Sequence, residues 1–163
     1  MKSDYITREG WLALDRELKY LWKEERPKVT QAVSEAAAMG DRSENAEYIY
    51  GKKRLREIDR RVRYLSKRLE ILKIVDPHPQ QEGKVFFGAW VTVEDEQGQQ
   101  QTLRIVGSDE FEPAKNWISI NSPVARALIG KSLDDEVSVM VPNGKVTYFI
   151  VDIRYQTPHS LSD

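Results

Sequence analysis

The sequence contains no cysteine and only two histidines, His78 and His159, which lie far apart in proline-containing segments. Without cysteine the chain forms no disulfide, holds no thiolate-ligated zinc and has no cysteine nucleophile. Any metal ion that it binds must therefore be held mainly by oxygen ligands, which is the chemistry that Mg²⁺ prefers.

Long apolar runs are also lacking. No stretch reaches the roughly 18 apolar residues that a membrane span requires, and the N-terminal "MKSDYITREG" lacks the apolar core of a signal peptide. With 163 residues, 40% apolar and 31% charged, the chain has the composition of a globular protein of one or two domains. We therefore expect a cytoplasmic protein with no membrane partner.

The net charge of −1 conceals an asymmetry between two halves of the chain. Residues 1–76 hold 18 basic and 14 acidic residues, a net +4, whereas residues 77–163 hold 7 and 12, a net −5. The segment "DPHPQQEG" near the change carries two prolines and a glycine, which favours a linker. We predict a first domain at 1–76, a linker at 77–83, a second domain at 84–157 and a tail at 158–163.

Apolar residues in the first half recur at helical spacing. From Leu55 onward six of them alternate at steps of three and four, which is typical of a coiled-coil seam: Leu55, Ile58, Val62, Leu65, Leu69 and Leu72. A looser pattern runs from Trp11 to a helix end near Met39, so the short tip between them predicts an antiparallel hairpin that satisfies its own seam as a monomer. Pro27 predicts a kink around residues 24–26.

The second half changes to the two-residue period of strands. "KVFFGAWVTVED" places five apolar residues on one face, Val85, Phe87, Ala89, Val91 and Val93. "QQQTLRIVG", "NWISI", "VSVMV" and "KVTYFIVDIRY" predict further strands, with Asn143-Gly144 at a hairpin turn. Ser122 and Pro123 suit the start of a short helix that ends at Gly130. The predicted fold class is α+β, a coiled-coil hairpin followed by a small antiparallel sheet with one helix.

The second arm of the hairpin is strongly basic. Residues 52–68 contain nine Lys and Arg against two acidic residues. Six of the cations predict a stripe on or beside the helix face opposite the seam: Lys52, Lys53, Arg56, Arg60, Arg63 and Lys67. A solvated outer face is the ordinary explanation, but such faces usually mix both signs of charge. The stripe favours a polyanionic partner, above all a nucleic-acid backbone.

The hairpin tip reads "GDRSENAEY" and carries two carboxylates with two possible roles. Asp41 and Glu44 have the spacing of a capping box, in which Asp41 would cap the second arm and Glu44 would reach back three residues. Alternatively, both project from the tip and supply hard oxygen ligands to Mg²⁺. Two carboxylates do not hold Mg²⁺ tightly alone, so a second macromolecule would complete such a site.

At these residues the sequence resembles a known family. The motifs "GDRSENAEY", "KKRLREIDRRVRYL", "EERP", "EGKVFFGAWV" and "SPVARALIGK" are similar to those of the bacterial Gre transcript cleavage factors, over roughly residues 5–155. The dense basic face and "KVFFGAWV" favour the GreB type over its GreA sibling.

The resemblance implies a function and a set of site residues. Such factors insert the coiled coil into the secondary channel of a backtracked bacterial RNA polymerase, where Asp41 and Glu44 would stabilise a Mg²⁺ shared with the polymerase. The polymerase then cleaves its own transcript, so this chain would be a cofactor rather than an enzyme. The stripe would hold the nascent RNA 3′ end, and an FKBP-like second domain would dock through Asn121, Ser122 and Pro123.

Other classes of function compete with this interpretation. A channel-binding transcription inhibitor would share the architecture without the paired Asp41 and Glu44. An FKBP-like domain by itself suggests a peptidyl-prolyl isomerase, although fold is weak evidence for function. A purely structural coiled coil would show no salt-sensitive affinity for RNA polymerase complexes.

Overall fold

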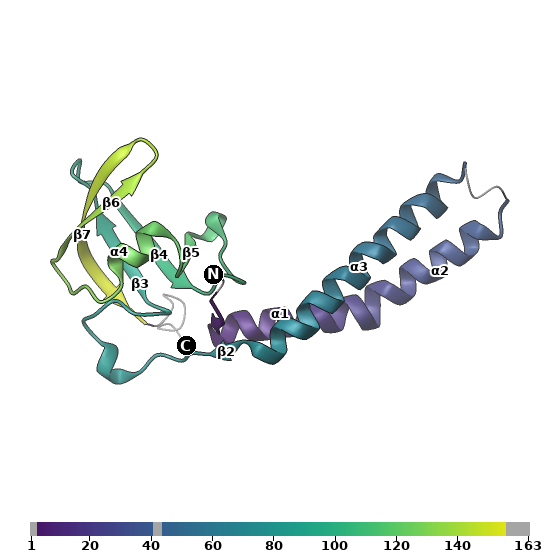
Figure 1. The fold of residues 1–163 in the computed structure, drawn as a ribbon, viewed down its shortest axis with the longest axis horizontal. Coiled ribbons are helices and arrows are strands. Elements are labelled where there is room, and N and C mark those ends of the chain that lie inside the picture. The colour runs from purple at the N-terminus through teal and green to yellow at the C-terminus, as the bar shows by residue number, and fades with distance from the viewer. Residues whose placement is uncertain (1–2, 41–43, 156–163) are drawn as a thin grey trace. The chain divides into compact units, whose positions relative to one another are not determined.

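A computed structural model describes residues 3–40 and 44–155 (Figure 1). The chain divides into two compact units, one formed by Trp11–Leu72 and the other by Met1–Gly10 together with Lys73–Asp163. The first ten residues therefore belong with the second half of the sequence, a long-range association that the hydrophobic pattern does not reveal.

The first unit is a helical hairpin. Its first arm consists of α1 (Arg8–Tyr20), the π-helical segment η1 (Leu21–Glu25) and α2 (Arg26–Ala37), and its second arm is α3 (Ala46–Ile71). In Figure 1, α2 and α3 lie side by side on either side of the tip. The predicted seam is confirmed, since Ile58 and Leu65 are buried on α3 and Leu72 is buried at its C-cap. The first arm contributes the buried Leu14 and Leu21.

The predicted irregularity near Pro27 takes the form of a π-helical segment. Pro27 lies in the first turn of α2 and has no N–H to donate to the preceding turn. The π-helical segment η1 directly precedes it and widens the turn by one residue, which accommodates the missing hydrogen bond. Segments of this kind often mark functional positions, and η1 carries an exposed tryptophan, Trp22.

Ion pairs tie the two arms together on both sides of the seam. Arg54 Nε lies 2.5 Å from Glu25 Oε2, and Arg61 lies 2.7 Å from Glu17. On the other side, Arg26 Nε donates to Asp59 Oδ1 at 2.8 Å. These are the flanking charge pairs of a coiled coil, and they fix which faces of the arms meet.

The Glu25 pair predicts a pH effect. The hydrogen bond from Arg54 lowers the pKa of Glu25, although desolvation opposes the shift. A depressed folded-state pKa contributes stability above the usual carboxyl pKa, and that stability is lost as the pH falls through the folded value. We expect Glu25→Gln to lower the free energy of unfolding at pH 7 by roughly 0.5–1 kcal/mol, discounted for solvent screening. Denaturant titrations should show this difference shrinking as the pH falls below the usual carboxyl pKa, and a difference that grows on acidification would contradict the assignment.

The second unit is built around a five-stranded sheet with the order β5-β4-β3-β7-β6. The strands are β3 (Trp90–Glu94), β4 (Gln100–Val106), β5 (Trp117–Ser119), β6 (Glu136–Val141) and β7 (Gly144–Arg154). The short helix α4 (Pro123–Leu128) packs Ala125 and Leu128 into the same apolar core as Val91, Val139 and Ile150. One sheet and one helix share this core, as predicted.

Three local predictions for this unit are wrong. The sheet is mixed, because β5 pairs parallel to β4 after the connection through the 3-10 turn Pro113–Lys115. The strand expected from residue 84 begins only at Trp90, since Gly88 at φ +87° breaks the extended backbone, although Val85 and Ala89 are buried as expected. The hairpin turn is centred on residues 142–143, because Val141 pairs with Gly144.

The N-terminal residues are held to the second unit by hydrogen bonds. β1 (Tyr5–Ile6) pairs in parallel with β2 (Lys73–Ile74). Just beyond β1, the Thr7 hydroxyl accepts from Gly10 N–H at 3.1 Å and donates to the Glu110 carboxylate. Glu110 Oε2 also accepts from the backbone N–H groups of Thr7 and Gly107, both at 2.8 Å. Burial raises the pKa of Glu110, and these donors oppose the shift.

We expect Glu110→Ala to lower the free energy of unfolding by about 2–3 kcal/mol, because it leaves partly buried backbone N–H groups without an acceptor. The matched control is Glu112→Ala, which removes an exposed carboxylate whose one ion pair within residues 3–40 and 44–155 is with Lys115 at 3.5 Å. That control should cost less than about 0.5 kcal/mol. Equal effects in chemical denaturation would show that Glu110 is not a structural tether.

A buried arginine adds to the same attachment. Arg104 is only 4% exposed, and its guanidinium lies 5.2 Å and 5.0 Å from the ring centroids of Trp90 and Trp117. Its charge is compensated by Glu9, whose Oε2 accepts from Nη1 at 2.5 Å. A buried charge of this kind persists only when paired, so Glu9 and the indole rings together account for Arg104.

Candidate functional site

The second arm of the hairpin begins at a different residue from the one predicted. Asn45 caps α3, because its Oδ1 accepts from Tyr48 N–H at 3.1 Å. Its Nδ2 donates to the Ala36 carbonyl at 2.8 Å, so the same side chain also ties the two arms together. Of the two roles left open for Asp41 and Glu44, a capping box at the start of α3 is ruled out, since the helix starts at Ala46 and Glu44 precedes the cap.

Glu44 is consequently available for another role. It lies in a turn at the tip, is exposed, and forms no ion pair or side-chain hydrogen bond with the described residues. Asp41, Arg42 and Ser43 lie outside the described residues. Within 3–40 and 44–155, no group of three or more His, Cys, Asp or Glu side chains is placed to hold a metal ion. As an exposed carboxylate, Glu44 is suited to supply one oxygen ligand to the Mg²⁺ site that the sequence predicts, which needs further ligands from elsewhere.

The basic residues of α3 separate into two sets. Arg54 and Arg61 bind carboxylates of the first arm, and Arg68, seven residues further on, is buried. The second set is exposed and forms no ion pair with any residue that the structure describes: Lys52, Lys53, Arg56, Arg60, Arg63 and Lys67. We call this second set the basic stripe. These are the six cations that the sequence analysis assigned to a stripe, and within the described residues none of them forms an ion pair.

The stripe follows the length of α3. The span from Lys53 to Lys67 is about 21 Å at the rise of an α-helix. Phosphates of a single strand can contact several cations over such a length, and each contact releases counterions. Asp59 of α3 is paired with Arg26, whose hydrogen bond lowers its pKa, and the positive charge of Arg63 contributes further to this shift. The stripe therefore remains a positive surface.

The predicted docking residues lie together in the second unit. Ser122 Oγ caps α4 by accepting from Ala125 N–H at 3.2 Å, and Pro123 is the exposed first residue of that helix. Asn121 is partly buried and donates from Nδ2 to Ser108 Oγ at 3.0 Å. The three residues are thus consecutive at the start of α4, and the bond from Asn121 to Ser108 gives Asn121 a structural role that the sequence did not indicate.

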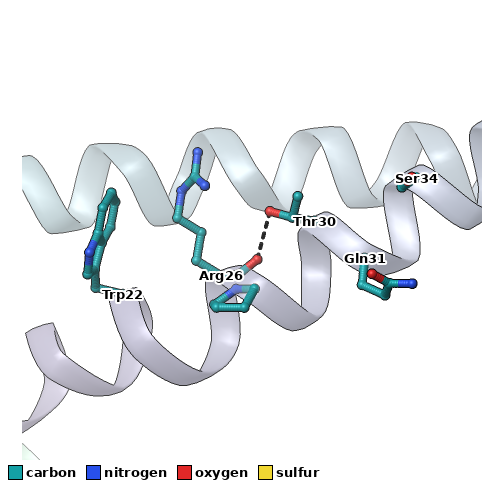
Figure 2. Close-up of a pocket in the computed structure, with 6 residues that line it drawn as sticks. Trp22, Arg26, Thr30, Gln31 and Ser34 are labelled. Carbon is teal, nitrogen blue, oxygen red and sulfur yellow. Dashed lines mark hydrogen bonds between the residues drawn. The ribbon is translucent and has the colours of Figure 1, made fainter.

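Two features of the hairpin escaped prediction. Asn45 was missed because Asp41 and Glu44 have the spacing of a capping box that begins four residues earlier. An asparagine directly before Ala46 and Glu47 is an equally good N-cap signal. Trp22 was missed because it lies outside the apolar spacing of the seam, and it forms part of a groove on the first arm (Figure 2). None of the helices in the described ranges is long and apolar enough to cross a membrane.

Comparison with known proteins matches both parts of the chain. A family model described as the N-terminal part of a transcription elongation factor matches residues 4–74, and one for the C-terminal part of GreA/GreB matches residues 80–155. The chain is 79% identical over 155 residues to transcription elongation factor GreB of Yersinia pestis, covering 95% of this chain and 91% of that protein.

Two further relatives carry the same name. The GreB of Haemophilus influenzae is 74% identical over 155 residues, covering 95% of this chain and 98% of its own. The GreB of Pseudomonas aeruginosa is 62% identical over 150 residues, covering 92% and 89%. The chain therefore belongs to the GreA/GreB family of transcription elongation factors, and within that family it is of the GreB type.

Proposed function

We propose that this protein enters the secondary channel of a backtracked bacterial RNA polymerase and stimulates cleavage of the nascent transcript, which rescues arrested complexes. The observation that carries the proposal is the combination of two features, one just before α3 and one along it. Glu44 is an exposed, uncommitted carboxylate at the tip, and the uncompensated basic stripe begins two turns along α3 from it. The first feature suits a metal ion, and the second suits the phosphates of RNA.

The chain acts as a cofactor of the polymerase, not as an enzyme. Glu44, together with Asp41, would hold a Mg²⁺ that further ligands from the polymerase complete. When bound, such an ion stabilises negative charge at the reacting phosphate. The contribution of this chain is to carry its carboxylates on the hairpin tip, just before the residue Asn45 that caps α3 and bonds to Ala36.

The basic stripe would bind the extruded 3′ segment of the nascent RNA along the hairpin. Arg56, Arg60 and Arg63 are exposed and unpaired among the described residues, so binding requires no internal ion pair to break. The second unit would dock on the polymerase through Asn121, Ser122 and Pro123. We take the protein to be a cytoplasmic monomer with two linked modules. Docking of the second unit would then raise the effective concentration of the hairpin at the channel.

The direct test adds the full-length protein to stalled, 3′-labelled elongation complexes in the presence of Mg²⁺. We expect short labelled RNA to be released and the shortened transcript to be extended again when nucleotides are supplied. Protein that binds the complexes and blocks elongation without releasing RNA would instead identify a channel-binding inhibitor. Protein that has no effect on the complexes would contradict the proposal.

A further inference from the structure

Trp22 is an unusual surface residue for a coiled-coil arm. Its side chain is 54% exposed, whereas its neighbour Leu21 is buried in the seam. The guanidinium of Arg26 lies 5.3 Å from the centroid of the Trp22 ring, which is a cation–π contact. In Figure 2 both side chains extend from the first arm toward α3. One part of the indole is thus held by a cation while much of the ring stays accessible.

A shallow groove continues from Trp22 along the same arm. Its lining consists of Trp22, Arg26, Pro27, Thr30, Gln31 and Ser34, and these six include no acidic side chain. The Thr30 hydroxyl donates to the Arg26 carbonyl at 2.9 Å (Figure 2). Gln31 donates to Glu35 at 2.9 Å. The groove therefore combines one aromatic ring with hydroxyl and amide groups that suit a polar, ring-containing ligand.

Contacts between the arms place Trp22 beside the basic stripe. Arg26, which covers the ring, also donates to Asp59 of α3 at 2.8 Å. Arg63 lies four residues after Asp59 and Arg56 three residues before it, so all three share one side of the helix. Arg63 is also close enough for its charge to lower the pKa of Asp59, after the larger effect of the Arg26 hydrogen bond. The exposed indole and the stripe therefore border the same side of the hairpin.

We propose that Trp22 is a stacking platform for a base of single-stranded RNA whose phosphates follow the basic stripe. The inference rests on the proposed function, because it assigns a further contact to the same RNA segment. Aromatic rings beside a cationic track are the usual means of binding single strands without sequence preference. A protein partner is less well matched, since tryptophan anchors in protein interfaces are fully desolvated in well-packed pockets. Here the Arg26 guanidinium lies against the ring, and hydroxyl and amide groups line the rest of the groove.

The test uses the full-length protein and two labelled octaribonucleotides, oligoadenylate and an abasic strand of equal length and charge. Trp22→Ala should weaken oligoadenylate binding roughly five- to 150-fold, the range for loss of one base–aromatic stack. Binding of the abasic strand should change less than about twofold, because the phosphate contacts remain. Trp22→Phe should restore part of the lost affinity.

Tyr20→Ala is the matched control. Tyr20 is 53% exposed, nearly the same as Trp22, but it lies two residues earlier and so points to another side of the arm. It should leave both affinities unchanged. Equal losses for the two strands in Trp22→Ala, or equal effects of Tyr20→Ala and Trp22→Ala, would overturn the stacking assignment.

The stacking inference and the proposed function fail in different ways. If Trp22→Ala leaves RNA binding intact but weakens binding to polymerase complexes, Trp22 contacts protein and the inference is wrong, whereas wild-type cleavage activity would still support the function. If the wild-type protein releases no RNA from stalled complexes, the proposed function fails whatever Trp22 does. Selective loss of oligoadenylate binding in Trp22→Ala together with wild-type cleavage supports both.

Discussion

Replacing Glu44 by glutamine is expected to reduce transcript cleavage by at least about tenfold without changing the melting temperature. The reduction follows because loss of one charged metal ligand costs more than about 1.4 kcal/mol of transition-state stabilisation. The amide keeps the size of the side chain but removes the anionic oxygen that Mg²⁺ prefers. Because Asn45 caps α3, the substitution removes no cap. Asp41→Asn should have the same effect on cleavage.

The matched control for this prediction is Asn45→Ala, next to Glu44 at the tip. It removes the bond to Tyr48 N–H and the bond to the Ala36 carbonyl. We expect a loss of about 1–3 kcal/mol in hairpin stability, from the cap and one further hydrogen bond. Cleavage should fall only as far as folded protein is lost, and Asn45→Asp should recover the cap but not the bond between the arms.

Raising the Mg²⁺ concentration provides the discriminating measurement. Cleavage by Glu44→Gln should recover in part, because the weakened site fills at higher metal concentration, whereas Asn45→Ala should gain no more than the wild type. If Glu44→Gln instead lowers stability while each folded molecule still cleaves normally, the carboxylate is structural and the metal assignment is wrong.

The long periodic elements could be predicted from sequence because many residues in each element contribute to the same hydrophobic pattern. Six seam positions fixed α3 and its buried face, and alternation in "VSVMV" and "KVTYFIVDIRY" fixed β6 and β7. The members of the basic stripe followed from the same helical period. What the sequence could not show is which cations the first arm neutralises, since Glu17 and Glu25 meet Arg61 and Arg54 only after the chain folds back.

Errors arose where one or two residues decide the outcome. Asn45 and the Asp41–Glu44 pair are both good starting signals, and only tertiary contact with Ala36 shows which is used. The parallel direction of β5 depends on how the connection after β4 returns, which no alternation pattern encodes. Likewise, the attachment of Thr7 to Glu110 joins positions more than one hundred residues apart.

Reversing the charge of three stripe residues is expected to separate RNA binding from folding. Arg56, Arg60 and Arg63 form no ion pair within the described parts of the chain, so changing all three to glutamate should alter the free energy of unfolding by less than about 1 kcal/mol. Changing Arg54 and Arg61 to glutamate is the control, because it breaks the pairs with Glu25 and Glu17 and sets like charges together. That control should lower the free energy of unfolding of the hairpin clearly more than the triple variant does.

In cleavage assays, the triple variant should fail most on deeply backtracked complexes, whose longer extruded RNA reaches further along α3. The dependence on salt gives the quantitative check. Each lost phosphate contact reduces the log–log slope of affinity against salt by about 0.7 for a single strand, so three contacts predict a reduction of about 2. The difference between variant and wild type should shrink as salt rises, because screening already weakens the wild-type contacts. An unchanged slope, or crosslinks from the RNA 3′ segment that never reach α3, would place the RNA path elsewhere and leave the stripe as a solvated face.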